Sequence, residues 1–175
     1  MNPTRRTRLL STAALAAVAA ATTISASAAP ETPAPAPRAA DQHHSATHWH
    51  QRCAAQFDHA VRAYVKTTQT RNAPGFNALL DQDATVIFAN GGVLSGNKEV
   101  SAFITDFFAD PGWTQTFTKL HQHVEGCRTG FVLFDSVYSV PADHRVSPLV
   151  IGVTFTYRNG RWLVLHNQDS TGPAS

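Results

Sequence analysis

The chain has 175 residues, with 14 Lys and Arg, 12 Asp and Glu, and two cysteines. Its formal charge of +2 depends on the N-terminus, where residues 1–28 hold three arginines and no acidic residue. Without that segment, 11 basic and 12 acidic residues remain, a charge of about −1 with histidine neutral. The rest of the chain therefore lacks the basic surface that binding to nucleic acid or anionic lipid requires, and its length fits one domain.

The first 28 residues have the three parts of an export signal. Three arginines precede an uncharged, alanine-rich run from Leu9 to Ile24, and small residues follow up to Ala28. Ser and Thr dilute the run and no stop-transfer pattern follows, so cleavage after Ala28 leaves no membrane anchor. We therefore predict a secreted or extracytoplasmic protein, exported by the Sec route or, given the pair Arg5-Arg6, by the twin-arginine route.

Residues 29–52 are rich in Pro, Ala, Ser, Thr and His and poor in aliphatic side chains. Such a composition buries too little apolar surface to offset chain entropy and predicts a flexible linker. The segment carries a histidine cluster, His43, His44, His48 and His50. Clustered imidazoles can form a weak site for Cu, Zn or Ni ions, whereas a solvated leader is the simpler interpretation. No cofactor is expected.

Beyond the linker, the chain alternates between helical and strand patterns. Apolar residues at helical spacing from Cys53 to Val65 predict a helix of about four turns, and a short second helix is expected at Pro74–Leu80. A β-branched run at 85–88, followed by a turn and the pair Val93-Leu94, predicts two short strands. The apolar face of Asn97–Phe108 predicts a third helix.

The remaining chain predicts an antiparallel meander. Its four expected strands are 115–125, 129–140, 148–158 and 162–168, separated by turn sequences. Helices followed by such strands define an α+β domain over residues 53–172. Several strands are apolar on both faces, so one face can pack on the helices and the other can meet a second copy of the chain. A homodimer through the sheet is therefore expected.

The two cysteines, Cys53 and Cys127, both lie in the part of the chain that would be exported. An even number of cysteines in an oxidising compartment favours a disulfide between them. Two separate thiols are the alternative.

Five short motifs occur in order along the predicted domain: Ala63-Tyr64-Val65, Ala78-Leu79-Leu80, Asp83-Ala84-Thr85-Val86, Leu94-Ser95-Gly96 and Gly160-Arg161-Trp162-Leu163-Val164. With the order of elements, they resemble the NTF2-like superfamily, and in particular its SnoaL-like, DUF4440 and SgcJ/EcaC-type groups. The resemblance spans about residues 53–170. It implies an NTF2-like (cystatin-like) cone, in which three N-terminal helices pack on a curved, mainly antiparallel sheet of about six strands.

The resemblance also argues against the best-known chemistry of the superfamily. Tyr64 matches a tyrosine on the first helix of ketosteroid isomerases, but Phe88 and Val153 stand where those enzymes carry acids. A phenyl ring cannot take a proton from carbon, and a valine cannot donate to an oxyanion. Steroid isomerase activity is therefore not expected, and whether the domain is an enzyme stays open.

The resemblance implies an apolar cone that can hold a small hydrophobic molecule. Its expected lining is Phe57, Tyr64, Phe88, Phe103, Phe107, Trp113 and Val153. Strand alternation places His121 with His123 on one face, and His166 with Gln168 on another, with Asp169 beside them. Two histidines on one face together with a carboxylate could hold a metal ion or serve as acid and base, so the candidates for acid–base work at the mouth of the cone are Tyr64, His121, His166 and Asp169. Histidines two apart on a sheet are commonly surface residues.

Three function classes are consistent with these observations. The first is a domain that binds a hydrophobic ligand in the cone. The second is an enzyme that performs acid–base chemistry on a cyclic substrate. The third is an oligomeric assembly module without catalysis, which a filled cone would favour. A fold alone cannot choose among them.

Overall fold

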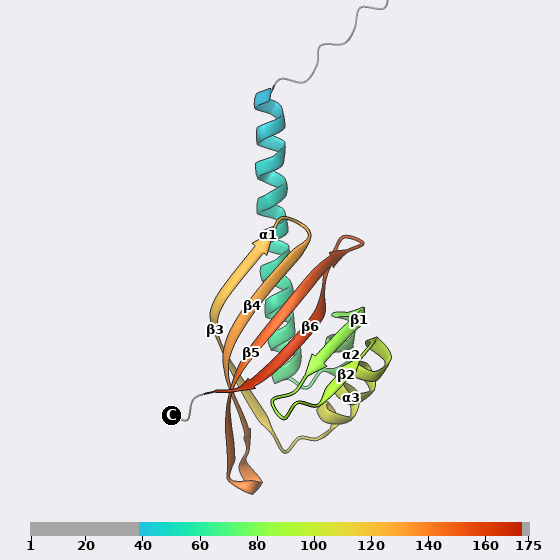
Figure 1. The fold of residues 1–175 in the computed structure, drawn as a ribbon, viewed down its shortest axis with the longest axis vertical. Coiled ribbons are helices and arrows are strands. Elements are labelled where there is room, and N and C mark those ends of the chain that lie inside the picture. Colours follow the sequence, from blue (N-terminus) through green and yellow to red (C-terminus); the bar gives the residue numbers. More distant parts are fainter. Residues whose placement is uncertain (1–38, 173–175) are drawn as a thin grey trace, which may run out of the picture. The chain divides into compact units, whose positions relative to one another are not determined.

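A computed structural model of the protein describes residues 39–172, with side chains from Gln51 onward. The elements in this range are α1 (Ala39–Gln69), α2 (Ala73–Asn77), β1 (Leu80–Ile87), β2 (Val93–Ser95), α3 (Asn97–Ala109), β3 (Thr114–Glu125), β4 (Thr129–Val140), the 3-10 turn η1 (Pro141–Asp143), β5 (Arg145–Arg158) and β6 (Arg161–Thr171). In Figure 1, α1 runs behind the long strands, and α2 and α3 lie near β1 and β2. No helix in this range is long and apolar enough to cross a membrane.

The six strands form one mixed sheet in the order β2-β1-β6-β5-β4-β3. Consecutive strands from β3 to β6 pair antiparallel as a meander, whereas β6 also pairs with β1 in parallel. We call the face that carries Val132, Phe134 and Val153 the inner face, because these side chains are buried, and the opposite face of the sheet the outer face. The expected α+β fold, with three helices on a mostly antiparallel sheet of six strands, is thus confirmed.

The first helix is longer than the sequence pattern predicts. We expected it to start at Cys53, but α1 begins at Ala39, so the prediction of a flexible linker was wrong for residues 39–52. No Pro or Gly interrupts the chain between Pro37 and Pro74. Because extension of a helix that packing has already nucleated costs little, the helix continues past the residues that touch the sheet.

The other predictions for the N-terminal part of the chain concern residues or side chains that the structure does not describe. The signal peptide at 1–28 and the linker residues 29–38 lie outside the described part of the chain. The side chains of the histidine cluster, His43, His44, His48 and His50, lie outside it as well.

The first strand begins earlier than expected. β1 starts at Leu80 rather than at residue 85, and α2 correspondingly ends at Asn77. The polar residues Asp81-Gln82-Asp83, which look like a turn in the sequence, lie within the strand. Asp81 is buried there, with its Oδ2 3.4 Å from Nε of Arg158. This long-range ion pair lets a strand accommodate a carboxylate that its local sequence would place in water.

The core lies between the helices and the inner face of the sheet. Phe57 on α1 is fully buried, and its ring meets those of Phe155 and Trp162 edge to face, with centroids 5.2 and 5.0 Å apart. Gly130 on β4 makes this approach possible, because a Cβ there would lie 2.7 Å from both Cδ2 and Cζ of Phe57. The first helix therefore packs closely on the sheet, because the ring of Phe57 occupies the space that Gly130 leaves open by having no side chain.

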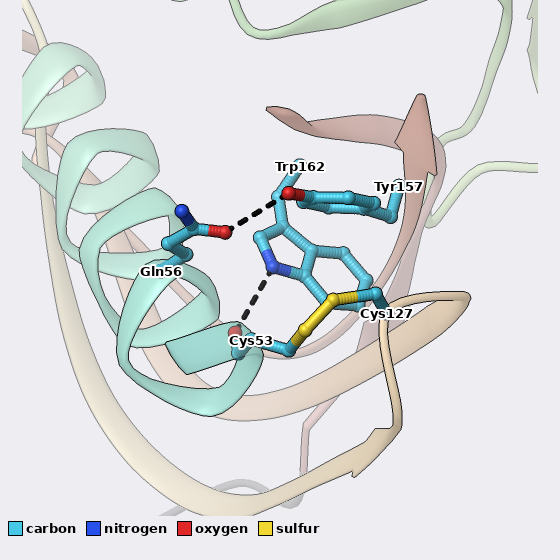
Figure 2. Close-up of a disulfide and its surroundings, with 5 residues drawn as sticks. All are labelled: Cys53, Gln56, Cys127, Tyr157 and Trp162. Carbon is cyan, nitrogen blue, oxygen red and sulfur yellow. Dashed lines mark hydrogen bonds between the residues drawn. A yellow bond between two sulfur atoms is a disulfide. The ribbon is translucent and has the colours of Figure 1, made fainter. Parts of the chain in front are cut away.

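A disulfide joins Cys53 on α1 to Cys127 in the turn between β3 and β4, with Cα atoms 5.3 Å apart. Figure 2 shows its surroundings: Trp162 donates its indole N–H to the carbonyl oxygen of Cys53 at 3.1 Å, and Tyr157 donates its hydroxyl to Oε1 of Gln56, also at 3.1 Å. The predicted disulfide is thus confirmed, and it closes the end of the domain where α1 leaves the sheet.

Candidate functional site

Three polar side chains form a hydrogen-bonded chain between α1 and β6. Tyr64 donates its hydroxyl to Oδ1 of Asn167 at 2.6 Å, and Asn167 donates through Nδ2 to Oδ1 of Asp169 at 2.9 Å. Tyr64 and Asn167 are buried, whereas Asp169 is partly exposed. This series of hydrogen bonds therefore leads from the core toward the surface and ends in an ionisable group, the carboxyl of Asp169.

A β-bulge places the side chains of Asn167 and Asp169 on the inner face of β6. Val164 is buried there, and strict alternation would bring His166 inward next. The pairing of β6 with β5 shifts between Val164 and His166, which leaves Leu165 as an extra residue. One extra residue reverses the alternation, so Asn167 and Asp169 face inward and His166 faces outward.

A small cavity of about 80 Å³ lies beside the Tyr64–Asn167–Asp169 chain. Its walls are mostly apolar: Val86, Ile104, Ile151 and Val164, with the rings of Phe76, Phe88, Phe103, Phe107 and Phe108. The polar part of the lining consists of Thr68, Gln115 and the three hydrogen-bonded residues Tyr64, Asn167 and Asp169. The volume admits a few water molecules and is well below the ~300 Å³ from which ligand pockets usually start.

A larger groove of about 830 Å³ adjoins this cavity. The two spaces share five lining residues, Phe88, Phe103, Phe107, Gln115 and Asp169. The other groove residues are Ala89, Asn90, Tyr138, Arg145, Val146, Ser147, Pro148, Leu149 and Thr171. The groove is of the size that proteins use for small molecules, and Asp169 stands where it meets the inner cavity.

The aromatic wall of the groove is held by ring contacts. Phe88 meets Phe103 at 4.9 Å, Phe103 stacks on Phe107 at 5.5 Å, and Phe107 stacks on Trp113 at 4.5 Å between centroids. Trp113 is buried and donates its indole N–H to the carbonyl oxygen of Phe107 at 3.0 Å. Trp113 thus supports the wall from behind without lining the groove.

The predicted pocket residues divide into two groups. Phe88, Phe103 and Phe107 line both spaces, and Tyr64 lines the inner cavity. Three others lie in the core and line neither space: Phe57, Trp113 and Val153. Phe57 and Val153 are fully buried where α1 packs on the sheet, so their apolar character is explained by packing.

The predicted catalytic residues are not brought together as a set. Tyr64 and Asp169 meet through Asn167, but His121 and His166 line neither space. In β3, the pairing with β4 shifts between Lys119 and His121, so a second bulge turns His121 to the exposed outer face. Within residues 51–172, no three His, Cys, Asp or Glu side chains lie close enough to hold a metal ion.

Asn167 and Gln115 are among the polar residues of the site that sequence reasoning missed. Asn167 links Tyr64 to Asp169, and Gln115 on β3 lines both spaces while it donates to Oγ of Ser136 at 3.1 Å. A polar residue among apolar inward positions would have been the signal. The bulge in β6 hid that signal for Asn167, because unbroken alternation assigns it to the outer face.

Burial governs the electrostatics of the site. Burial raises the pKa of Asp169, and the hydrogen bond from Asn167 opposes that rise. Burial also raises the pKa of Tyr64, and the nearby carboxylate of Asp169 raises it further. Tyr64 is therefore a neutral hydrogen-bond donor, and Asp169 is more readily protonated than an exposed aspartate.

Replacement of Asp169 by Asn is expected to stabilise the fold at neutral pH. The pKa of Asp169 is higher in the folded chain than the ~3.9 of the unfolded chain, so the wild type loses stability as pH rises from about 4 through the folded pKa. The variant lacks this loss, which is about 1.4 kcal/mol for each unit of pKa difference. Its advantage in melting temperature should therefore be largest at neutral pH and disappear toward pH 4.

Melting temperatures between pH 4 and 8 test this prediction. Asp135→Asn removes an exposed carboxylate on β4 and serves as the control. An advantage of Asp169→Asn that does not change with pH would contradict the assignment of the penalty to ionisation.

The fold and the site define a class of protein, and the sequence comparison gives the family. The arrangement of three helices on a mixed, mostly antiparallel sheet of six strands is the fold that solved NTF2-like and cystatin-like proteins share. The SnoaL-like domain family matches residues 61–165, and the chain belongs to this family. A search of the curated proteins finds no match.

Solved structures share the fold at low identity. An NTF2-like protein of unknown function from Pseudomonas putida KT2440 has a TM-score of 0.58 at 16% identity, covering 70% of this chain and 89% of its own. An uncharacterized cystatin-like protein from Caulobacter vibrioides has 0.58 at 15%, covering 70% and 91%. An LEH-like epoxide hydrolase of M. tuberculosis has 0.52 at 11%, covering 65% and 80%. At these identities the likeness shows the fold alone.

Proposed function

We propose that this domain binds a small apolar molecule in the groove, where a few polar side chains of the lining orient it. The observation that carries the proposal is an 830 Å³ groove with three phenylalanines and one ionisable group where it meets the inner cavity. Ligand sites are mostly apolar surfaces with a few polar groups that fix orientation. The deep cone itself is largely filled, since its cavity measures about 80 Å³, so the ligand lies in the groove rather than around Tyr64.

The proposal is tested by titration with 1-pyrenebutanol, a neutral, ring-containing fluorescent probe. Phe103→Ser removes a ring that lines both spaces, and the probe should then bind at least tenfold more weakly, because burial of a Phe side chain is worth about 1.5–3 kcal/mol. Phe131→Ser is the matched control, since Phe131 is also partly buried but lies on the outer face of β4.

Two results would contradict the proposal. One is the absence of probe binding to the wild type, and the other is an equal loss of affinity in both variants.

Light scattering on the same samples also tests the proposed homodimer. The outer face carries the partly buried apolar residues Phe131, Leu133, Val137 and Val150, and a dimer would have twice the monomer mass. A persistent monomer mass would refute it.

A second candidate is an enzyme that uses Asp169 as an acid or base. The favouring observation is a carboxyl group with a raised pKa at the junction of groove and cavity, positioned by a hydrogen bond from Asn167. Ketosteroid isomerase chemistry is not proposed, because the side chains at Phe88 and Val153 have no acid group, and Val153 is fully buried. Reaction of a bound substrate that Asp169→Asn abolishes would favour this candidate over simple binding.

A further inference from the structure

The groove carries a single basic side chain, Arg145 at the start of β5. Among the residues that line the groove, Arg145 is the only base and Asp169 is the only acid. No ion pair within residues 51–172 includes Arg145, although Asp143 lies two residues before it in the chain. The guanidinium group is thus available to a ligand in the groove.

The ring of Tyr138 supports this guanidinium. Arg145 pairs with Val140 across the β4–β5 hairpin, and its Cζ lies 5.7 Å from the centroid of the Tyr138 ring. This cation–π contact limits the orientations of the planar guanidinium group, which carries N–H groups along its edge. Two such N–H groups match the two oxygens of a carboxylate.

The two charged groups lie at opposite ends of the groove. Asp169 pairs with Ile151 on β5, and Arg145 precedes Ile151 by six residues on the same strand. At ~3.3 Å per residue, the two backbone positions are about 20 Å apart. Between them the groove is lined by Pro148 and Leu149 and by the phenylalanine wall. A ligand that contacts both ends is therefore elongated, and apolar along most of its length.

We propose that the groove selects elongated apolar carboxylic acids, with the carboxylate on Arg145 and the hydrophobic body against Phe88, Phe103 and Phe107. This inference rests on the proposed function, since it assigns the chemical class of the ligand in the same groove. The single planar base favours a carboxylate over a phosphate dianion, which is usually held by several donors.

Titration with a matched pair of probes tests the inference. 1-Pyrenebutanoate and 1-pyrenebutanol share ring and tether and differ only in the acid group. Arg145→Gln should weaken binding of the acid about tenfold, as expected for loss of a charged hydrogen bond, and leave binding of the alcohol unchanged. Arg145→Lys keeps the charge without the planar fork and should give an intermediate affinity for the acid.

Arg62→Gln is the control for binding elsewhere. Arg62 is exposed on α1 and lines a separate cavity of about 350 Å³ together with Lys66 and Lys119, which is the rival site for an anion. The inference requires that Arg62→Gln leave the affinity for the acid unchanged.

The outcomes separate the two proposals. If the wild type binds neither probe, the proposed function fails and this inference fails with it. If the alcohol binds but the acid binds no better in the wild type than in Arg145→Gln, only the inference fails. A loss of acid binding in Arg62→Gln, with none in Arg145→Gln, would move the anion site to α1 and overturn the inference as well.

Discussion

Replacement of both Cys53 and Cys127 by Ser is expected to lower the free energy of unfolding by about 4 kcal/mol. The disulfide closes a loop of 75 residues, counted as the separation of 74 plus one, and the chain-entropy model gives this magnitude for a loop of that length. The loss falls on the junction between α1 and the sheet, where Trp162 also bonds to Cys53. The contact of the middle of α1, around Cys53, with the sheet should therefore open first.

Chemical denaturation under non-reducing conditions measures this effect. The reduced wild type is the control and should match the double Ser variant. Intact mass of protein recovered from the culture supernatant or periplasm tests the redox state and the proposed export together. We expect a chain that begins near Ala29 and lacks the two thiol hydrogens. Equal stability of the oxidised wild type and the double variant would contradict the prediction, and recovery of only the full-length reduced chain would refute export.

Gly130→Ala is expected to destabilise the fold by about 1–3 kcal/mol, the usual cost of overpacking a core. The added methyl group would lie 2.7 Å from Cδ2 and Cζ of Phe57, a fully buried ring that has no room to move between Phe155 and Trp162. Backbone conformation is not the cause, because the only glycines with positive φ among residues 51–172 are Gly91, Gly96, Gly126 and Gly160.

A double variant separates this clash from other effects. In a Phe57→Leu background the ring is gone, so the additional cost of Gly130→Ala should fall well below its cost in the wild type. Gly152→Ala is the matched control, because that Cβ would face Phe131 at 3.3 Å on the outer face of the sheet. Equal costs of Gly130→Ala in both backgrounds, measured by urea denaturation, would show that the Phe57 contact is not responsible.

Most of the fold could be predicted from local patterns. The strand 129–140 has the expected bounds, and the other strands of the meander begin or end within a few residues of prediction, because apolar alternation and turn residues act locally. The start of β1 could not be predicted, since Asp81 lies in a strand only because Arg158 reaches it from β5. That contact joins residues far apart in the chain and leaves no local signature.

The site was harder to predict for a related reason. Two bulges, at Leu120 in β3 and at Leu165 in β6, reverse the alternation on which the histidine predictions depended. His121 and His166 therefore face outward, and Asn167 and Asp169 take the inward positions. The aromatic wall was predictable, because Phe103 and Phe107 follow a helical stripe that no insertion disturbs.

The place of β6 in the sheet has a consequence for how the protein is made. Among the strands that the structure describes, β6 comes latest in the sequence, yet it lies third in the sheet, between β1 and β5, and it carries Asn167 and Asp169. Until residues 161–171 emerge, β1 with β2 and the β3–β5 meander are two separate fragments without the strand that joins them. The nascent chain therefore cannot complete this sheet before residues 161–171 have been synthesised, and a chain truncated within β6 would lose both the sheet and the groove.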